Sequence, residues 1–167
     1  MRKIVIFGNS GSGKSTFAKH MSEKHNIAHL DLDTLAWQDT QPPARQPIKL
    51  AQQSIKHFLD THSNWVIEGC YSDLIEYLLP ECNEIYFLNL PIEACIENAK
   101  ARPWEPHKYE TKEQQDANLD MLIDWIKQYP KREDEFSLNA HQHIFSHFRG
   151  TKHMYVNNIP LRPYTKR

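Results

Sequence analysis

The sequence predicts an α/β fold in which helices cover both faces of a sheet of five parallel strands. Short runs of β-branched and aromatic residues alternate along the chain with longer segments that read as helices. The best strand candidates are apolar along most of their length, which is typical of parallel strands buried on both faces. Glycine, proline, asparagine or acidic residues close these runs.

The strand candidates lie at residues 3–7, 28–32, 65–68, 84–90 and 153–156. The first runs into Gly8, the second and third end in acidic residues, Pro91 stops the fourth, and Asn157 closes the last. In parallel sheets of this kind, ligands bind beyond the carboxyl ends of the strands. The residues at these strand ends are therefore the first candidates for a functional site.

Six helices are expected between and after these strands, at residues 14–25, 46–62, 71–79, 92–101, 112–128 and 132–147. The fifth has the clearest amphipathic pattern, because Leu119, Leu122, Ile123 and Ile126 lie on one helical face. Two segments rich in proline, 39–47 and 103–111, read as loops. Long loops in a small domain usually serve function.

Size and composition predict one domain spanning residues 1–167. The net charge of −1 gives no general basic field for nucleic acid, so a nucleic-acid partner is not expected. No apolar stretch approaches the roughly 20 residues needed to cross a bilayer, and no leader sequence is evident. We therefore expect a cytoplasmic protein that has no membrane partner; its oligomeric state is open. Cys70, Cys82 and Cys95 lack C-x-x-C spacing and are expected to be reduced thiols.

Residues 8–16, with the sequence GNSGSGKST, complete the pattern G-x-x-x-x-G-K-[ST] between the first strand and the first helix. Glycines let backbone N–H groups surround phosphate oxygens, and the following helix N-terminus adds donors. Lys14 is expected to reach the β- and γ-phosphates of a nucleoside triphosphate, and Ser15 to ligate Mg²⁺. The expected nucleotide-binding residues are Gly8, Ser10, Gly11, Ser12, Gly13, Lys14, Ser15 and Thr16.

Three carboxylates follow two of the strands. Asp31 and Asp33 lie two positions apart at the end of the second strand, so both side chains are expected to face one cleft. Asp31 would serve the metal or accept a proton, and Asp33 would bind the acceptor; a helix N-cap is the alternative for Asp33. Glu68 ends the third strand where a Walker B carboxylate ligates Mg²⁺, although a surface glutamate is the alternative.

Phosphoryl transfer also needs positive charge near the transferred group. Arg102, beside the second loop, and Arg132, at the start of the sixth expected helix, are the candidates. His143 and His147 share a helical face, but the absence of a further ligand at suitable spacing argues against zinc. Trp37 could stack on an acceptor or pack in a loop.

The spacing of residues 8–16, 29–33, 66–69 and 101–103 resembles the adenylate kinase-like P-loop kinases. Within them it is most similar to the small DNA topology modulation proteins, and more distantly to shikimate and gluconate kinases. The resemblance covers about residues 1–105 and, more loosely, the last strand. It implies a three-layer P-loop NTPase fold with strand order 2-3-1-4-5, an acceptor-side segment at about 34–62 and a lid at about 103–112.

The resemblance also implies that ATP and Mg²⁺ are used for phosphoryl transfer. It assigns Asp31 to the Mg²⁺ shell, Asp33 to acceptor hydroxyls and Arg102 to the lid arginine. Adenylate kinases place an arginine shortly after the third strand for the acceptor's phosphate, but here Gly69 is followed by CYSD. Arg45 is the arginine that remains on that side, and a less charged hydroxylated acceptor suits Asp33, Arg45 and Glu68 better than a nucleoside monophosphate.

Two functions are therefore consistent with the sequence. The first is a kinase that moves the ATP γ-phosphate to a small hydroxylated or nucleotide acceptor, with Lys14, Asp31, Arg102 and Arg132 as catalytic residues. The second is an ATP-binding regulatory protein linked to nucleic acid, without small-molecule kinase activity. A GTPase is disfavoured because the chain has no N-K-x-D element for guanine.

Overall fold

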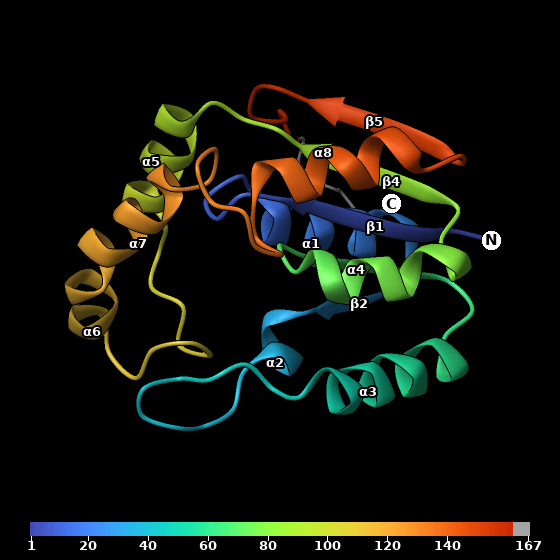
Figure 1. Ribbon diagram of the computed structural model, residues 1–167, viewed down its shortest axis with the longest axis horizontal. Coiled ribbons are helices and arrows are strands. Elements are labelled where there is room, and N and C mark those ends of the chain that lie inside the picture. Colours follow the sequence, from blue (N-terminus) through green and yellow to red (C-terminus); the bar gives the residue numbers. More distant parts are fainter. Residues whose placement is uncertain (162–167) are drawn as a thin grey trace.

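The computed structural model describes residues 1–161, which form an α/β fold around a five-stranded sheet (Figure 1). The strands are all parallel, and their order is β2-β3-β1-β4-β5. They comprise β1 (Lys3–Gly8), β2 (Ala28–Asp31), β3 (Trp65–Gly69), β4 (Glu84–Leu88) and β5 (Thr151–Tyr155). The predicted fold class and strand order are confirmed.

Helices cover both faces of this sheet. The helices are α1 (Lys14–His25), α2 (Asp33–Ala36), α3 (Ile48–Thr61), α4 (Ser72–Leu78), α5 (Ile92–Ala101), α6 (Lys112–Ala117), α7 (Leu119–Lys127) and α8 (Leu138–His147), with a 3₁₀ turn η1 (Leu79–Glu81) after α4. In Figure 1, α4 and α8 lie in front of the sheet and α1 lies behind it. Helices α5, α6 and α7 gather beyond the carboxyl ends of the strands.

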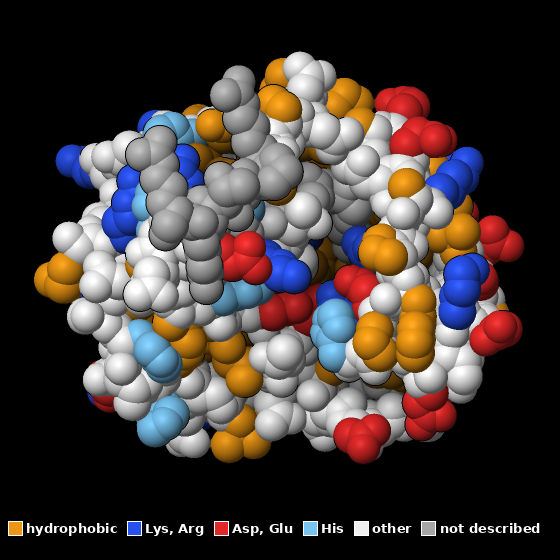
Figure 2. All heavy atoms as spheres, turned by 180° about the vertical axis from the view of Figure 1, so that it is seen from behind, with side chains coloured by type: hydrophobic (Ala, Val, Ile, Leu, Met, Phe, Trp, Pro, Cys, Tyr) orange, Lys and Arg blue, Asp and Glu red, His pale blue; other side chains and the backbone are white. Residues whose placement is uncertain are grey.

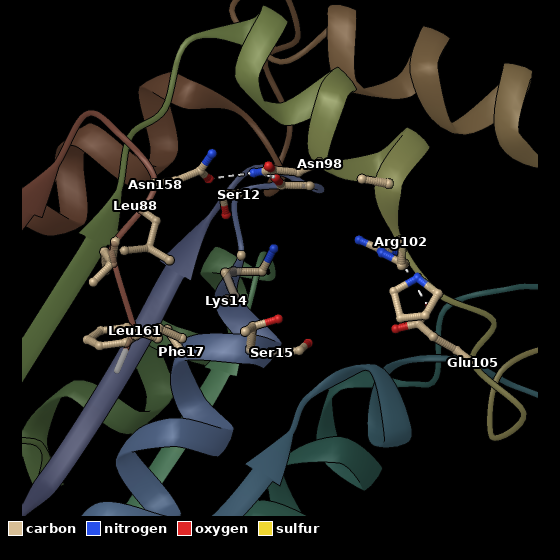
Figure 3. Close-up of a pocket in the computed structure, with 16 residues that line it drawn as sticks. Ser12, Lys14, Ser15, Phe17, Leu88, Asn98, Arg102, Glu105, Asn158 and Leu161 are labelled. Atoms are coloured by element: carbon tan, nitrogen blue, oxygen red, sulfur yellow. Dashed lines mark hydrogen bonds and ion pairs between the residues drawn. The ribbon is translucent and has the colours of Figure 1, made fainter. Parts of the chain in front are cut away.

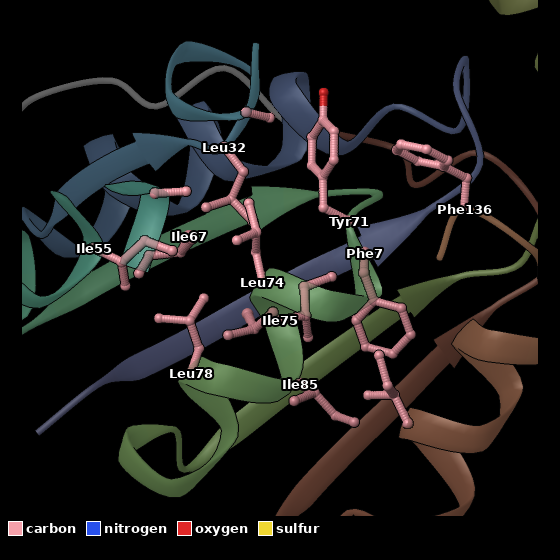
Figure 4. Close-up of a cluster of buried hydrophobic side chains, with 14 of the residues drawn as sticks. Phe7, Leu32, Ile55, Ile67, Tyr71, Leu74, Ile75, Leu78, Ile85 and Phe136 are labelled. Carbon is pink, nitrogen blue, oxygen red and sulfur yellow. The ribbon is translucent and has the colours of Figure 1, made fainter. Parts of the chain in front are cut away.

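Strand alternation divides the core into two clusters. Val5 and Phe7 of β1 point to the face covered by α3, α4 and α8, where Ile55, Leu74 and Ile144 pack (Figure 4). The second cluster lies on the other face, between the sheet and helices α1, α5 and α7. It contains Ile4, Ile6, Phe17, Met21, Cys95, Ala99 and Ile126. Because β1 is buried on both faces, its carboxyl end is a rigid support for the loop that follows.

Several element boundaries differ from the sequence prediction. The helix predicted at 112–128 is two helices, because the chain turns at Asn118, whose N–H bonds to carbonyls of α6. The helix predicted at 132–147 begins only at Leu138, where the Ser137 side chain accepts a hydrogen bond from the N–H of Ala140. Before it, Arg132 folds back onto Asp134 and forms a turn.

The strand predictions were closer. Strand β4 stops at Leu88, two residues before the predicted end, and β5 begins at Thr151, two residues before the predicted start. The one-turn helix α2 was not predicted. Among residues 1–161, no helix is both long and apolar enough to span a bilayer. All three cysteines are free thiols.

Candidate active site

The loop between β1 and α1 has the backbone geometry of a phosphate cradle. Gly11 and Gly13 adopt φ values of +76° and +89°, which favour glycine. A Cβ on Gly11 would lie 2.3 Å from the carbonyl oxygen of Cys95, so the loop packs directly on α5. A Cβ on Gly13 would meet nothing within 4 Å, so this position opens onto free space. The loop is therefore closed on one side and open on the other.

The open side of the loop faces a cavity of about 440 Å³. Figure 3 shows Lys14 and Ser15 on one side of this cavity and Arg102 and Glu105 on the other. The cavity is also lined by Gly11, Ser12, Gly13, Thr16, Phe17, Leu88, Asn98, Ala101, Pro103, Asn158, Ile159 and Leu161. It thus brings the phosphate loop, the end of α5 and the segment after β5 together.

Two polar groups of the loop fit an anion in this cavity. The Lys14 ammonium donates to the carbonyl oxygen of Asn9 at 2.8 Å, a weak substitute for a phosphate oxygen. The Ser12 hydroxyl is buried, and within the described residues it has no hydrogen-bond partner. A buried hydroxyl normally finds a partner, and a phosphate oxygen would supply one.

Glu68 lies beside the loop at the end of β3 and is 1% exposed. The Ser15 hydroxyl donates to Glu68 Oε1 at 2.8 Å. Glu68 is also the register partner of Asp31 on the neighbouring strand β2. Burial, the Glu68 charge and the Asp33 charge raise the pKa of Asp31 to about 7, against the opposing effect of Lys108. These carboxylates repel one another, and a bound cation would relieve that repulsion.

Asp33 is the first residue of α2, and its carboxylate is held by two donors. The Tyr71 hydroxyl donates to Oδ1, and Lys108 donates to Oδ2 at 3.0 Å. Partial desolvation would raise the pKa of Asp33, but the charge of Lys108 and these hydrogen bonds outweigh it and lower the pKa. Lys108 also lies 3.9 Å from Asp31 Oδ2. The two aspartates therefore share one lysine and differ in proton affinity.

The helix-cap alternative for Asp33 does not describe its side chain. Asp31 Oδ1 instead accepts the backbone N–H of Asp33 at 2.9 Å, so Asp31 stabilises the start of α2. Trp37 Nε1 donates to the Tyr71 hydroxyl at 2.7 Å, which fixes that hydroxyl's own proton toward Asp33. Trp37 remains 40% exposed beside this chain of hydrogen bonds.

Arg102 lines the cavity, and its guanidinium lies 3.5 Å from Glu105. Arg45 is not among the residues that line this cavity. Arg45 bonds to Asp73 and Glu135 at 3.1 and 2.8 Å and packs over the Tyr71 ring. The role of Arg45 in substrate binding stays a prediction, and its charge is shared with these two carboxylates.

Arg132 is likewise held by its neighbours. Its guanidinium bonds to Asp134 at 2.7 Å and stacks on the Trp125 ring at 3.5 Å from the centroid. Its charge is thus paired, and it is not among the residues that line the cavity, so a catalytic role for Arg132 stays a prediction.

The residues fit a Mg²⁺ ion that is coordinated by both the protein and the nucleotide. Protein Mg²⁺ sites commonly use one or two carboxylates, a hydroxyl, substrate phosphates and water instead of a complete protein cage. Ser15, Glu68 and Asp31 provide such a partial set. Within residues 1–161, no three His, Cys, Asp or Glu side chains lie close enough together to hold a metal ion. His143 and His147 therefore have no third ligand of these types there.

His141 of α8 is completely buried and contacts the residue that follows β3. Its Nε2–H donates to the carbonyl oxygen of Cys70 at 2.8 Å, because a carbonyl can only accept. Its Nδ1 therefore accepts the Tyr129 hydroxyl at 2.6 Å. Burial lowers the pKa of His141 to about 4, so the ring is neutral in the folded protein.

This histidine predicts a loss of stability in mild acid. Below the unfolded-state pKa of 6.5, the unfolded chain takes up a proton that folded His141 refuses until about pH 4. The free energy of unfolding should therefore fall by up to about 3 kcal/mol between these pH values. Urea unfolding of wild type and His141→Gln at pH 7 and pH 5 measures this decrease in the free energy of unfolding. Wild type should lose more stability than the variant, and equal losses would contradict the assignment.

Several residues of the site were not singled out in the sequence analysis. Lys108 falls in the predicted lid but carried no motif, and it is 75 positions from Asp33. Tyr71 stands in the segment that departs from the adenylate kinases, and that departure was the available signal. The amide of Asn9 donates to the carbonyl oxygen of Ile126, and the amide of Asn98 donates to the carbonyl oxygen of Gly11 and to Asn158. Such contacts between distant segments leave no pattern in one sequence.

Comparisons with known proteins concern the family and the fold of the chain. The family model described as AAA domain matches residues 4–120. A gluconokinase from Sinorhizobium meliloti 1021 is similar in structure, with a TM-score of 0.53, 15% identity, and coverage of 92% of this chain and 82% of that one. A shikimate kinase from Acinetobacter baumannii in complex with shikimate has a TM-score of 0.43 and 19% identity, with coverage of 86% and 91%. A search of curated proteins gave no match.

Proposed function

Because the chain belongs to the AAA domain family, we propose that it is an ATP-dependent phosphotransferase that acts on a small hydroxylated acceptor. The observation that carries this proposal is the position of Lys14, Ser15 and Glu68 around one open phosphate cradle. The carboxylate of Asp31 adjoins them through the register of β2 and β3. The fold shared with a gluconokinase supports the same class of protein.

The residues of the cradle would position and stabilise the transferred group. Lys14 would exchange its bond to the Asn9 carbonyl for phosphate oxygens, and backbone N–H groups of the loop would hold the remaining oxygens. Arg102, across the cavity, would neutralise charge that develops during transfer. Ser15, Glu68 and Asp31 would hold Mg²⁺, which supplies charge neutralisation between the phosphates when bound.

Two aspartates with different proton affinities suggest the roles on the acceptor side. Asp33 is held ionised by Lys108 and Tyr71 and would bind acceptor hydroxyl groups. Asp31, beside Glu68 on the neighbouring strand, would hold a Mg²⁺-bound water or accept the proton of the attacking hydroxyl. In this arrangement the lid segment 103–112 brings Lys108 across the cleft.

The acceptor is proposed to lack a phosphate group. Recognition of a phosphate dianion favours free arginines that bind it in bidentate fashion. Arg45 is paired with Asp73 and Glu135, and Lys108 is paired with Asp33. A sugar, sugar acid or other polyol would make hydrogen bonds to Asp33 without displacing these ion pairs.

A thermal-shift panel tests this proposal. The protein is mixed with Mg²⁺ and an unreactive ATP analogue, and polyols, sugar acids and nucleoside monophosphates are added in turn. A true acceptor raises the melting temperature because bound ligand adds RT ln(1 + [L]/Kd) to stability. Stabilising acceptors are then assayed for ³²P transfer from ATP. Stabilisation and phosphorylation confined to nucleoside monophosphates would contradict the proposed acceptor class.

The alternative function follows from the resemblance to DNA topology modulation proteins. It is that of an ATP-binding regulatory protein linked to nucleic acid. Acidic and basic side chains are interspersed on the face seen in Figure 2. The net charge of −1 is also a poor basis for binding a polyanion. Retardation of duplex DNA at low ionic strength would favour this role over the kinase.

A further inference from the structure

Two asparagine side chains fasten the phosphate loop to two helices of the domain. The buried Asn9 amide donates to the carbonyl oxygen of Ile126 on α7 at 3.2 Å. The Asn98 amide, on α5, donates to the carbonyl oxygen of Gly11 at 2.8 Å and to Asn158 Oδ1 at 2.7 Å (Figure 3). These bonds join segments 117 and 87 positions apart. The loop is thus tied to both helices through its own backbone and side chain.

These two helices flank residues 102–118, the lid segment, which contains the lid predicted at 103–112. Helix α5 ends at Ala101 and α7 begins at Leu119, so residues 102–118 leave one helix and return to the other. The two helices share the second core cluster, where Cys95 and Ala99 pack with Ile126. A displacement of the lid therefore acts on the same pair of helices that hold the phosphate loop.

The lid is braced internally, so it can transmit a displacement. The Gln115 side chain accepts the N–H of Glu105 at 2.8 Å and donates to the carbonyl oxygen of Pro103 at 3.1 Å. Asn118 donates to the Tyr109 hydroxyl at 2.9 Å. At its far end, Lys108 reaches Asp33 across the cleft. Residues 102–118 thus connect the acceptor side of the site to α5 and α7.

The same asparagine that reaches α7 also holds the lysine of the loop. The carbonyl oxygen of Asn9 accepts from Lys14 at 2.8 Å and from the N–H of Ser12 at 3.2 Å. A shift of Asn9 therefore moves the resting position of the Lys14 ammonium. Glycine at position 11 cannot move toward α5, because its backbone already contacts Cys95. The loop responds to its two helices as a unit.

We propose that Asn9 and Asn98 are positioning residues that couple the phosphate loop to the lid, so that a nucleotide in the cradle orders residues 102–118. The inference rests on the proposed function, because it requires that the cradle binds a nucleoside triphosphate. Coupling of this kind is reciprocal: whatever holds the lid in place also strengthens nucleotide binding.

Hydrogen exchange of the full chain tests this coupling. Amide exchange in residues 103–118 is followed by mass spectrometry with and without Mg²⁺ and an unhydrolysable ATP analogue, for wild type, Asn9→Ala, Asn98→Ala and the double variant. Calorimetry gives the affinity of each protein for the analogue. Asn83→Ala is the matched control, because Asn83 makes comparable hydrogen bonds to Met1 and Lys3 at the opposite end of the sheet.

In wild type and Asn83→Ala, the analogue should slow exchange of the lid by about fivefold or more, the lower range of known couplings. In the single variants this protection should shrink, and in the double variant it should disappear while the analogue still binds. Equal protection in wild type, both single variants and the double variant would overturn the coupling and leave the proposed function intact. Failure of wild type to bind the analogue would overturn both. If Asn9→Ala does not fold, Asn98→Ala alone decides, by loss or retention of the protection.

Discussion

Replacing Lys14 with alanine should lower ATP turnover by about 10²-fold or more, because the variant removes the one ammonium that projects into the phosphate cradle from the loop. The fold should persist, since Lys14 makes a single hydrogen bond, to the carbonyl oxygen of Asn9. Steady-state kinetics and far-UV circular dichroism measure both quantities.

The matched control for this variant is Lys19→Ala. Lys19 is exposed on the same helix, α1, and lies outside the cavity. Its replacement should change turnover little. A Lys14→Ala protein that turns over ATP at the wild-type rate would remove the proposed mechanism, because the positive charge of the loop would then have no part in catalysis.

Replacing Glu68 with glutamine should separate nucleotide binding from its dependence on Mg²⁺. The amide keeps the size of the side chain and an oxygen for the Ser15 hydroxyl, but it removes the negative charge at the end of β3. We expect turnover to fall by roughly 10²-fold, and added Mg²⁺ to improve affinity for ATP much less than in wild type. Calorimetric titrations with and without Mg²⁺ measure the difference.

Glu84→Gln serves as the control for Glu68→Gln. Glu84 is also partly buried and accepts a side-chain hydrogen bond, from Tyr86, but it stands at the start of β4, at the opposite end of the sheet. Both variants exchange one carboxylate for an amide, so only the Glu68 variant should lose the Mg²⁺ effect. An unchanged Mg²⁺ effect in Glu68→Gln would show that the metal is held elsewhere.

The fold was predictable because its signals are local. Each strand of the sheet interior is a short apolar run ended by a turn residue, and the phosphate loop is a contiguous motif with a strand before it and a helix after it. Boundaries were less predictable where side chains decide them. The start of α8 is fixed by the Ser137 cap, and the apolar pattern of residues 112–128 continues through the turn at Asn118.

The acceptor side of the site was predictable only in part, for a physical reason. Asp31 and Asp33 could be placed because they follow a strand, and the structure brings both to Lys108. Their partner, Lys108, comes from a loop far along the chain, so no spacing pattern in the sequence predicts the contact. The ion pairs of Arg45 were unpredictable for the same reason: its partners Asp73 and Glu135 are 28 and 90 residues away.

The affinity of the cradle for a nucleotide is the property on which the proposed function depends most directly. Isothermal titration of the wild-type protein with an unhydrolysable ATP analogue, with Mg²⁺ and then with a chelator, measures that affinity. We expect one binding site per chain, with affinity that falls when Mg²⁺ is removed. Absence of binding at millimolar analogue, or binding that survives Lys14→Ala unchanged, would contradict the account.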